Sequence, residues 1–260
     1  MNRVIDTDNR SFSLNVTISC KGKKSFRVYA EDYGKENSKY ADRTITVDGQ
    51  RTIFFAFPVS PRQIFFNCIN IEEPKAEDFT VNVEAIPLKS YNIATDSETR
   101  DFMQLAIQFS QVAGFKTPDP NGTIYQTSDE HFTIKYFPVI KAPNGTPMGT
   151  PARIGHNTGI IEVAAVKFIK YTIPMRIAIL LHEFSHKYKN PKIGLEIGNE
   201  IGADINALYI YLGLGFSKID AICVFGQVFL KAQTPGNQAR MRKIMDYINK
   251  FENQEFAKVN

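Results

Sequence analysis

The fold and function of this chain are decided by the stretch Ile177-Ala-Ile-Leu-Leu-His-Glu-Phe-Ser-His186. Its apolar residues follow Pro174, which is favoured in a first helical turn, so the stretch is predicted to be a buried helix. His182 and His186 are four residues apart and therefore project from one face. Two imidazoles in this arrangement can bind one metal ion, and Glu183 can accept a proton from a metal-bound water. This pattern is known as HExxH.

A second polar pair lies in the next predicted helix, Asn199-Glu-Ile-Gly-Ala-Asp-Ile-Asn-Ala-Leu208. Glu200 and Asp204 are four residues apart and share a helix face, so one can bind the metal while the other orients a ligand. A catalytic zinc site has three protein ligands and an open position for water. We therefore predict that the two histidines and Glu200 bind the metal. Glu196, four residues earlier, is an alternative third ligand.

Together these two motifs resemble the gluzincin branch of the zincin metallopeptidases, especially its compact members. The resemblance covers residues 158–216 and implies a zinc-dependent hydrolase of peptide bonds. The implied roles are His182, His186 and Glu200 as zinc ligands, Glu183 as general base, and Asp204 as the partner of a ligand histidine.

The resemblance also implies a small sheet before the metal helix, whose edge strand aligns an extended peptide beside the zinc. This role is expected for Thr158–Val166. Strand character is also expected at His131–Val139 and Gly159–Ile169, and the Pro/Gly-rich segment Lys141–Pro151 is expected to be a loop. His156, a lone loop histidine before the edge strand, is expected to be structural or solvent-facing.

Composition excludes several classes of protein. The 260 residues are enough for two modest domains, and 43% hydrophobic and 22% charged residues are ordinary for a soluble globular protein. A net charge of +4 without clustered basic runs gives no reason to expect a nucleic-acid partner. The three cysteines are too few and too scattered for a disulfide framework.

No targeting or membrane segment is recognisable in the sequence. Residues 1–6 contain no apolar segment, so no classical secretion signal is expected. The most apolar runs, Ile205–Phe216 and Ile219–Leu230, are too short to span a bilayer. We expect the protein to be cytoplasmic or part of an assembled particle, with no membrane partner.

Residues 1–90 are predicted to form an antiparallel β module. Ser11–Ser19 alternates strictly between apolar and polar residues, and Thr44–Phe57 does so on both sides of Asp48–Gly49, a dipeptide that favours a tight hairpin. Further strands are expected at Ser25–Tyr29, Gln63–Ile69 and Phe79–Ile86. Six or seven short strands suggest a small sandwich or jelly-roll-like module. It contains no histidine, so we expect it to dock a protein partner or to be a structural appendage.

The domain boundary is expected at Pro87–Ala94, and residues 95–260 are expected to form the zincin-like domain. Thr95 followed by Glu98 has the capping-box pattern, which predicts a helix over Asp96–Ala113. A C-terminal helix over Pro235–Phe256 is expected to pack on a helix at residues 217–230.

The sequence thus predicts an α+β protein, with a sandwich or jelly-roll-like module followed by a zincin-like metallopeptidase domain. Its substrate would be a peptide or protein. The sequence does not distinguish a regulatory peptidase that cuts one partner from a general protease. The alternative is a structural or assembly protein of a virion or another large complex, in which the zincin domain is inactive.

Overall fold

A computed structural model describes residues 1–74, 78–88, 93, 95–188, 200–232 and 234–251. The protein has an α+β fold, as predicted, with antiparallel pairing in both of its sheets. The chain divides into two compact units, residues 1–89 and 90–260, and the division falls inside the predicted boundary. Among the described residues, no helix combines the length and the apolarity that a bilayer span requires.

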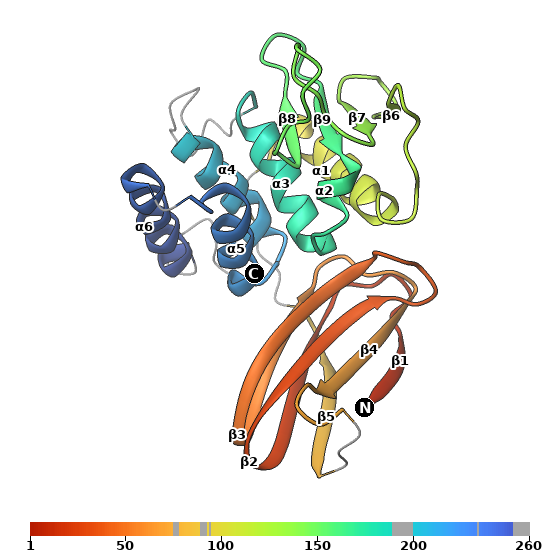
Figure 1. The fold of residues 1–260 in the computed structure, drawn as a ribbon, viewed down its shortest axis with the longest axis vertical. Helices are drawn as coiled ribbons and strands as arrows, with labels where there is room; N and C mark the ends of the chain where they lie inside the picture. The colour runs from red at the N-terminus through yellow and green to blue at the C-terminus, as the bar shows by residue number, and fades with distance from the viewer. Residues whose placement is uncertain (75–77, 89–92, 94, 189–199, 233, 252–260) are drawn as a thin grey trace. The chain divides into compact units, whose positions relative to one another are not determined.

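The N-terminal unit is one five-stranded antiparallel sheet. Its strands are β1 (Asn2–Asp6), β2 (Phe12–Asp32), β3 (Lys39–Phe57), β4 (Gln63–Asn70) and β5 (Phe79–Ile86). β2 pairs with β3 along its length, with β5 through its first half and with β4 through its second half, and β1 pairs with β4. Figure 1 shows β2 and β3 as long, curved strands. The prediction of six or seven short strands is therefore wrong, since the described residues form five strands and two of them are long.

The predicted hairpin at Asp48–Gly49 is also wrong, because β3 continues through this dipeptide. The β2–β3 connection lies at residues 33–38 instead. Gly49 lies opposite a bulge in β2, where the pairing moves from Ser19↔Gln50 to Lys23↔Asp48. Gly22 in this bulge and Gly49 both have φ of +74°. A positive φ serves a bulge as well as a turn, so the local signal alone does not separate the two.

The C-terminal unit combines a four-stranded sheet with a group of helices (Figure 1). The strands are β6 (Thr123–Gln126), β7 (Thr133–Phe137), β8 (Ala152–Ile154) and β9 (Ile161–Ala164). The helices are α1 (Ser97–Val112), α2 (Ala165–Phe168), α3 (Ile173–Ser185), α4 (Glu200–Gly213), α5 (Lys218–Val224), the π-helix η2 (Phe225–Phe229) and α6 (Pro235–Lys250). The strand order is β6-β7-β9-β8, with β7 and β9 parallel.

The edge strand of this sheet differs from the prediction. The expected edge, Thr158–Val166, contains β9, which pairs with β7 on one side and β8 on the other and is therefore internal. β8 is the edge strand instead. Arg153 of β8 is ion-paired with Glu162 of β9 at 2.6 Å. Because β8 has only three residues and follows a Pro/Gly-rich loop, it leaves no periodic signal in the sequence.

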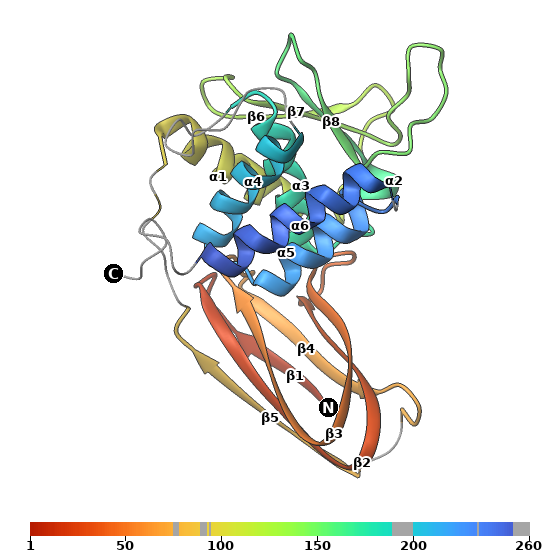
Figure 2. The same ribbon diagram turned by 90° about the vertical axis from the view of Figure 1, so that its left-hand side faces the viewer.

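The first and the last helix of the C-terminal unit differ in detail from the predictions. The helix at α1 is capped by Asp96, whose carboxylate accepts from Thr99 N at 2.7 Å, rather than by Thr95. α6 contacts α5, as predicted, and also contacts α4 (Figure 2). The part of the predicted C-terminal helix beyond Phe251 lies outside the described residues.

The metal helix predicted from the sequence is α3, and all its residues are buried. Arg176, in its first turns, is fully buried. Its guanidinium donates to the carbonyls of Ser110 in α1, Phe168 in α2 and Ile169 at 3.1, 3.3 and 2.9 Å. Arg176 therefore joins α3 to the two helices beside it.

Replacing this residue, Arg176→Met, is expected to destabilise the C-terminal unit by about 3 kcal/mol, because buried carbonyls lose their donors while the packing volume is kept. Circular dichroism at 222 nm during urea unfolding reports this unit, since the described helices all lie in it. Arg242→Met, at an exposed position of α6, is the matched control and should change the stability by less than about 0.5 kcal/mol. Equal stability of the two variants would contradict the role of Arg176.

Candidate metal centre

Two packed helices bring the predicted metal ligands together. His182 lies in the last turn of α3, and His186 is the residue that ends this helix. Glu200 is the first residue of α4, which packs against α3. The sequence alone places the histidines on one helix face, but the packing of α4 on α3 is what brings the glutamate to them.

The donor atoms of these three residues form a compact triangle. His182 Nε2 and His186 Nε2 are 3.1 Å apart. His182 Nε2 is 3.6 Å from Oε2 of Glu200, and His186 Nε2 is 3.6 Å from Oε1 of the same carboxylate. A tetrahedral zinc ion with bonds of about 2.0–2.1 Å has neighbouring ligand atoms roughly 3.3–3.4 Å apart. The three measured distances are close to this value, and one ligand atom from each residue lies within 4.8 Å of the others, so the three residues could hold one such ion. The alternative third ligand, Glu196, lies outside the described residues.

The electrostatic surroundings of His186 also favour the binding of a cation. Burial lowers the pKa of His186, and the neighbouring His182 lowers it further, which favours the neutral imidazole that binds metals. His182 Nε2 and His186 Nε2 face each other at 3.1 Å, a distance at which a proton or a cation can lie between the two nitrogens. Nitrogen and carboxylate ligands in this number are typical of a zinc site.

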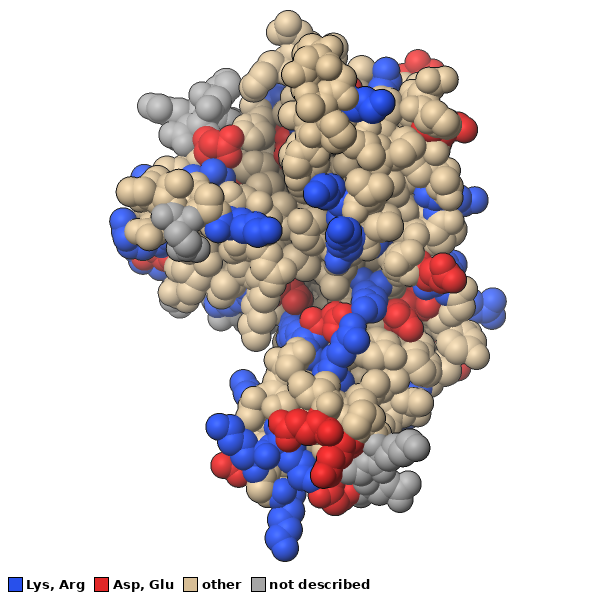
Figure 3. All heavy atoms as spheres, in the orientation of Figure 1, with Lys and Arg blue, Asp and Glu red and all other residues tan. Residues whose placement is uncertain are grey.

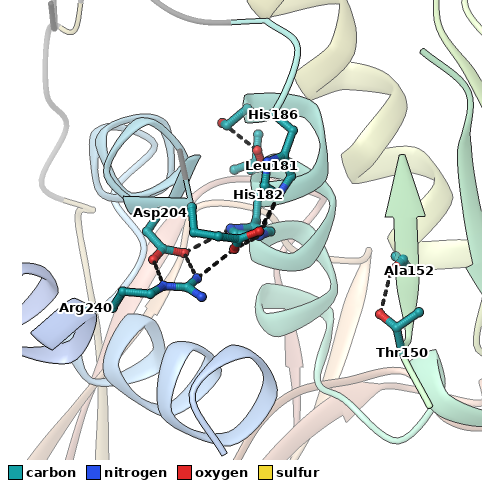
Figure 4. A network of polar contacts seen from close by, with 9 residues as sticks. Thr150, Ala152, Leu181, His182, His186, Asp204 and Arg240 are labelled. Atoms are coloured by element: carbon teal, nitrogen blue, oxygen red, sulfur yellow. Dashed lines mark hydrogen bonds and ion pairs between the residues drawn. The ribbon is translucent and has the colours of Figure 1, made fainter. Parts of the chain in front are cut away.

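Asp204 lies next to His182 (Figure 4), at the ring nitrogen Nδ1 that is not part of the triangle. It is fully buried, and its Oδ1 atom is 3.0 Å from His182 Nδ1. A carboxylate at this nitrogen favours the tautomer whose Nε2 carries the free lone pair. The structure thus brings Asp204 next to a candidate ligand histidine, where the resemblance implies that it should be.

The sequence did not reveal Arg240, on α6, as a member of this group. Its guanidinium donates to both carboxylate oxygens of Asp204 at 2.9 Å and is 3.0 Å from Glu200 Oε2. Figure 4 shows it extending from α6 towards Asp204. Nothing in the sequence distinguishes Arg240 from its basic neighbours Arg242 and Lys243, because the contact depends on how α6 packs.

We expect Arg240→Gln to weaken zinc binding about 10–100-fold, which is the usual effect of removing a group that orients a metal ligand. The affinity is measured by competition with a chelating dye. Arg242→Gln, with the same change two residues further along α6, is the control and should bind zinc like the wild type. Unchanged or tighter binding by Arg240→Gln would contradict a positioning role and would mean that the guanidinium competes with the metal for Glu200.

Glu183 is buried beside the triangle. Burial raises its pKa, while the charge of His182 and the hydrogen bond from the backbone N–H of Ile154 lower it. A carboxylate with a raised pKa is a better proton acceptor near neutral pH. Ile154 belongs to the edge strand β8, so this bond connects the candidate general base to the sheet edge.

The three predicted metal ligands and the predicted general base face one cleft of about 790 Å³. It is lined by His182, Glu183, His186 and Glu200, together with parts of β8, α2 and the π-helix. From the π-helix, the ring of Phe229 contacts that of His182 in a tilted arrangement, with ring centroids 4.1 Å apart. Short π-helices are frequent at functional sites. The sequence predicted an ordinary helix here, and nothing in it marked Phe229.

The remaining candidate residues are two other histidines and two tyrosines. His156 is exposed, as predicted, but it also lines the cleft, whereas His131 is exposed and 3.4 Å from Glu98. Tyr209 and Tyr211 are buried in α4 and act as packing residues.

Comparison of the chain with protein-family models, curated proteins and solved structures gives no match. The class of the site is therefore inferred from its own geometry.

Proposed function

We propose that this protein is a zinc-dependent metallopeptidase. The observation that carries the proposal is the triangle formed by His182, His186 and Glu200, which faces the same cleft as the buried carboxylate of Glu183. The triangle offers three ligands to one ion and leaves a position on its cleft side for a reactant. A candidate general base beside that position supports a catalytic rather than a purely structural site.

In the proposed reaction, His182, His186 and Glu200 hold a zinc ion. When bound, the ion acts as a Lewis acid that polarises a carbonyl and lowers the pKa of a water molecule to about 7. Glu183 accepts a proton from the attacking water at its carboxylate and then donates it to the nitrogen of the leaving amine. Asp204 keeps Nε2 of His182 free of a proton, and Arg240 holds Asp204 in place.

The edge strand β8 supports a peptide as the substrate. It lines the cleft and pairs with β9 on one side only among the described strands. An extended peptide can add to such an edge through backbone hydrogen bonds. Because Ile154 of β8 also contacts Glu183, a peptide on this edge would run close to the general base.

A second candidate function is structural, as part of a larger assembly. The observation in its favour is Arg240, which contacts Glu200 at 3.0 Å as well as Asp204. A guanidinium can neutralise both carboxylates and hold α3, α4 and α6 together in the absence of a metal ion. In that case the site would stabilise the fold and catalyse nothing.

The two functions differ in metal content and in hydrolysis. We expect about one zinc per chain by elemental analysis of the purified protein, and cleavage of a mixed peptide pool detected by mass spectrometry. Removal of zinc with a chelator should stop the cleavage, and added zinc should restore it. Protein that contains no zinc, binds none on addition and cleaves no peptide would overturn the proposed peptidase and favour the structural function.

A further inference from the structure

Three lysines line the cleft on two sides. Lys167 belongs to α2, Lys170 follows this helix, and Lys231 follows the π-helix η2 on the other side. Figure 3 shows Lys and Arg side chains over α2 and again beside α5, with mainly uncharged side chains on the surface between them. The three lysines of the cleft lining thus come from two separate parts of the chain, at α2 and after η2.

Among the described residues, no acidic side chain neutralises these lysines. In the part of the chain that the structure describes, no carboxylate forms an ion pair with Lys167, Lys170 or Lys231. The remaining basic side chain of the cleft, Arg153, is different, because it is paired with Glu162 at 2.6 Å. Of the described residues that line the cleft, Glu183 and Glu200 are the acidic ones.

With a metal ion bound, the site itself adds little to the net charge. Two charges on the ion and one on Arg240 are balanced by the three carboxylates of Glu183, Glu200 and Asp204. The three lysines then determine the sign of the potential in the cleft. A concave surface lined by one sign of charge concentrates ligands of the opposite sign.

We propose that the cleft selects peptides that carry a carboxylate close to the scissile bond. This inference rests on the proposed peptidase function, because it assigns the substrate class of the same site. The carboxylate can belong to an Asp or Glu side chain or to a free C-terminus, since a lysine ammonium binds either as a point charge. In both cases the lysines position the peptide by attracting its negative charge, and the backbone pairs with β8.

Binding is measured in the Glu183→Gln background, so that no peptide is consumed. The probes are three fluorescent peptides of one parent sequence. The first has an internal Glu and an amidated C-terminus. The second, neutral peptide has Gln in place of this Glu and an amidated C-terminus, and the third has Gln and a free C-terminus. Fluorescence anisotropy gives the affinity of each for the zinc-loaded protein at low and at high salt.

Two triple variants separate the cleft lysines from the overall charge. One carries Lys167→Gln, Lys170→Gln and Lys231→Gln. The matched control carries Lys21→Gln, Lys116→Gln and Lys243→Gln, which change the net charge equally at positions that do not line the cleft.

At low salt we expect at least one carboxylate peptide to bind about tenfold more tightly than the neutral peptide, an advantage that high salt should reduce. The cleft variant should lose this preference and the control variant should keep it. The peptide that gains affinity, the one with the internal Glu or the one with the free C-terminus, identifies the source of the carboxylate. Equal affinity for all three peptides would overturn the inference, and so would a preference that survives in the cleft variant, because the metal alone would then bind the carboxylate.

The proposed function is tested separately by the zinc content and by cleavage of the peptide pool by the wild type. A wild type that contains zinc and cleaves neutral and acidic peptides equally overturns only the substrate preference. Zinc-free, inactive protein overturns the peptidase function itself.

Discussion

Glu183→Gln is expected to lose nearly all peptide hydrolysis while it keeps its zinc. The amide has the shape of the carboxylate but cannot accept the proton of the attacking water. General acid–base catalysis contributes about 10²–10⁴-fold to rates, so kcat should fall by a factor in this range. Zinc should remain bound, because Glu183 is not among the three residues whose ligand atoms cluster.

The measurement combines kcat on a peptide that the wild type cleaves with zinc content by elemental analysis. Glu98→Gln, which makes the same change at an exposed position of α1, should behave like the wild type. Hydrolysis at the wild-type rate by Glu183→Gln would contradict the assigned role. Loss of zinc together with activity would mean that the glutamate holds the site together and does not act only as a base.

The parts of the site that the sequence could predict are those that depend on local spacing. His182 and His186 share a face because a helix repeats every 3.6 residues, and Glu200 and Asp204 share a face for the same reason. Two residues four apart share a face wherever the segment between them is helical. Both segments are helical in the structure, with His186 as the residue that caps α3. Spacing therefore keeps the members of each pair together, and the packing of α4 on α3 then brings the two pairs to one place.

The parts that could not be predicted depend on tertiary packing. Arg240 reaches Asp204 from a helix 36 residues further along the chain, and a single arginine on an amphipathic helix has no distinguishing pattern. β8 is too short for its periodicity to be visible, so the edge of the sheet was assigned to the more regular β9. At Asp48–Gly49 a glycine with positive φ is part of a bulged pairing, although the same residues favour a hairpin turn.

His182→Ala is expected to remove zinc from the protein and to abolish hydrolysis. The change deletes one of the three proposed ligands, and with it the ring that both Phe229 and Asp204 contact. Since removing a group that only orients a ligand already costs about 10–100-fold in affinity, losing the ligand itself should cost more than about 100-fold. Asp204 should stay in place because Arg240 holds it, so the variant should still fold.

His156→Ala is the matched control, because His156 also lines the cleft but does not belong to the group that could hold a metal ion. It should keep about one zinc per chain. Folding of both variants is followed by circular dichroism, so that loss of zinc is not confused with loss of structure. A folded His182→Ala protein that still binds one zinc tightly would contradict the proposed metal centre. Loss of zinc in His156→Ala alone would mean that His156, and not His182, is a ligand.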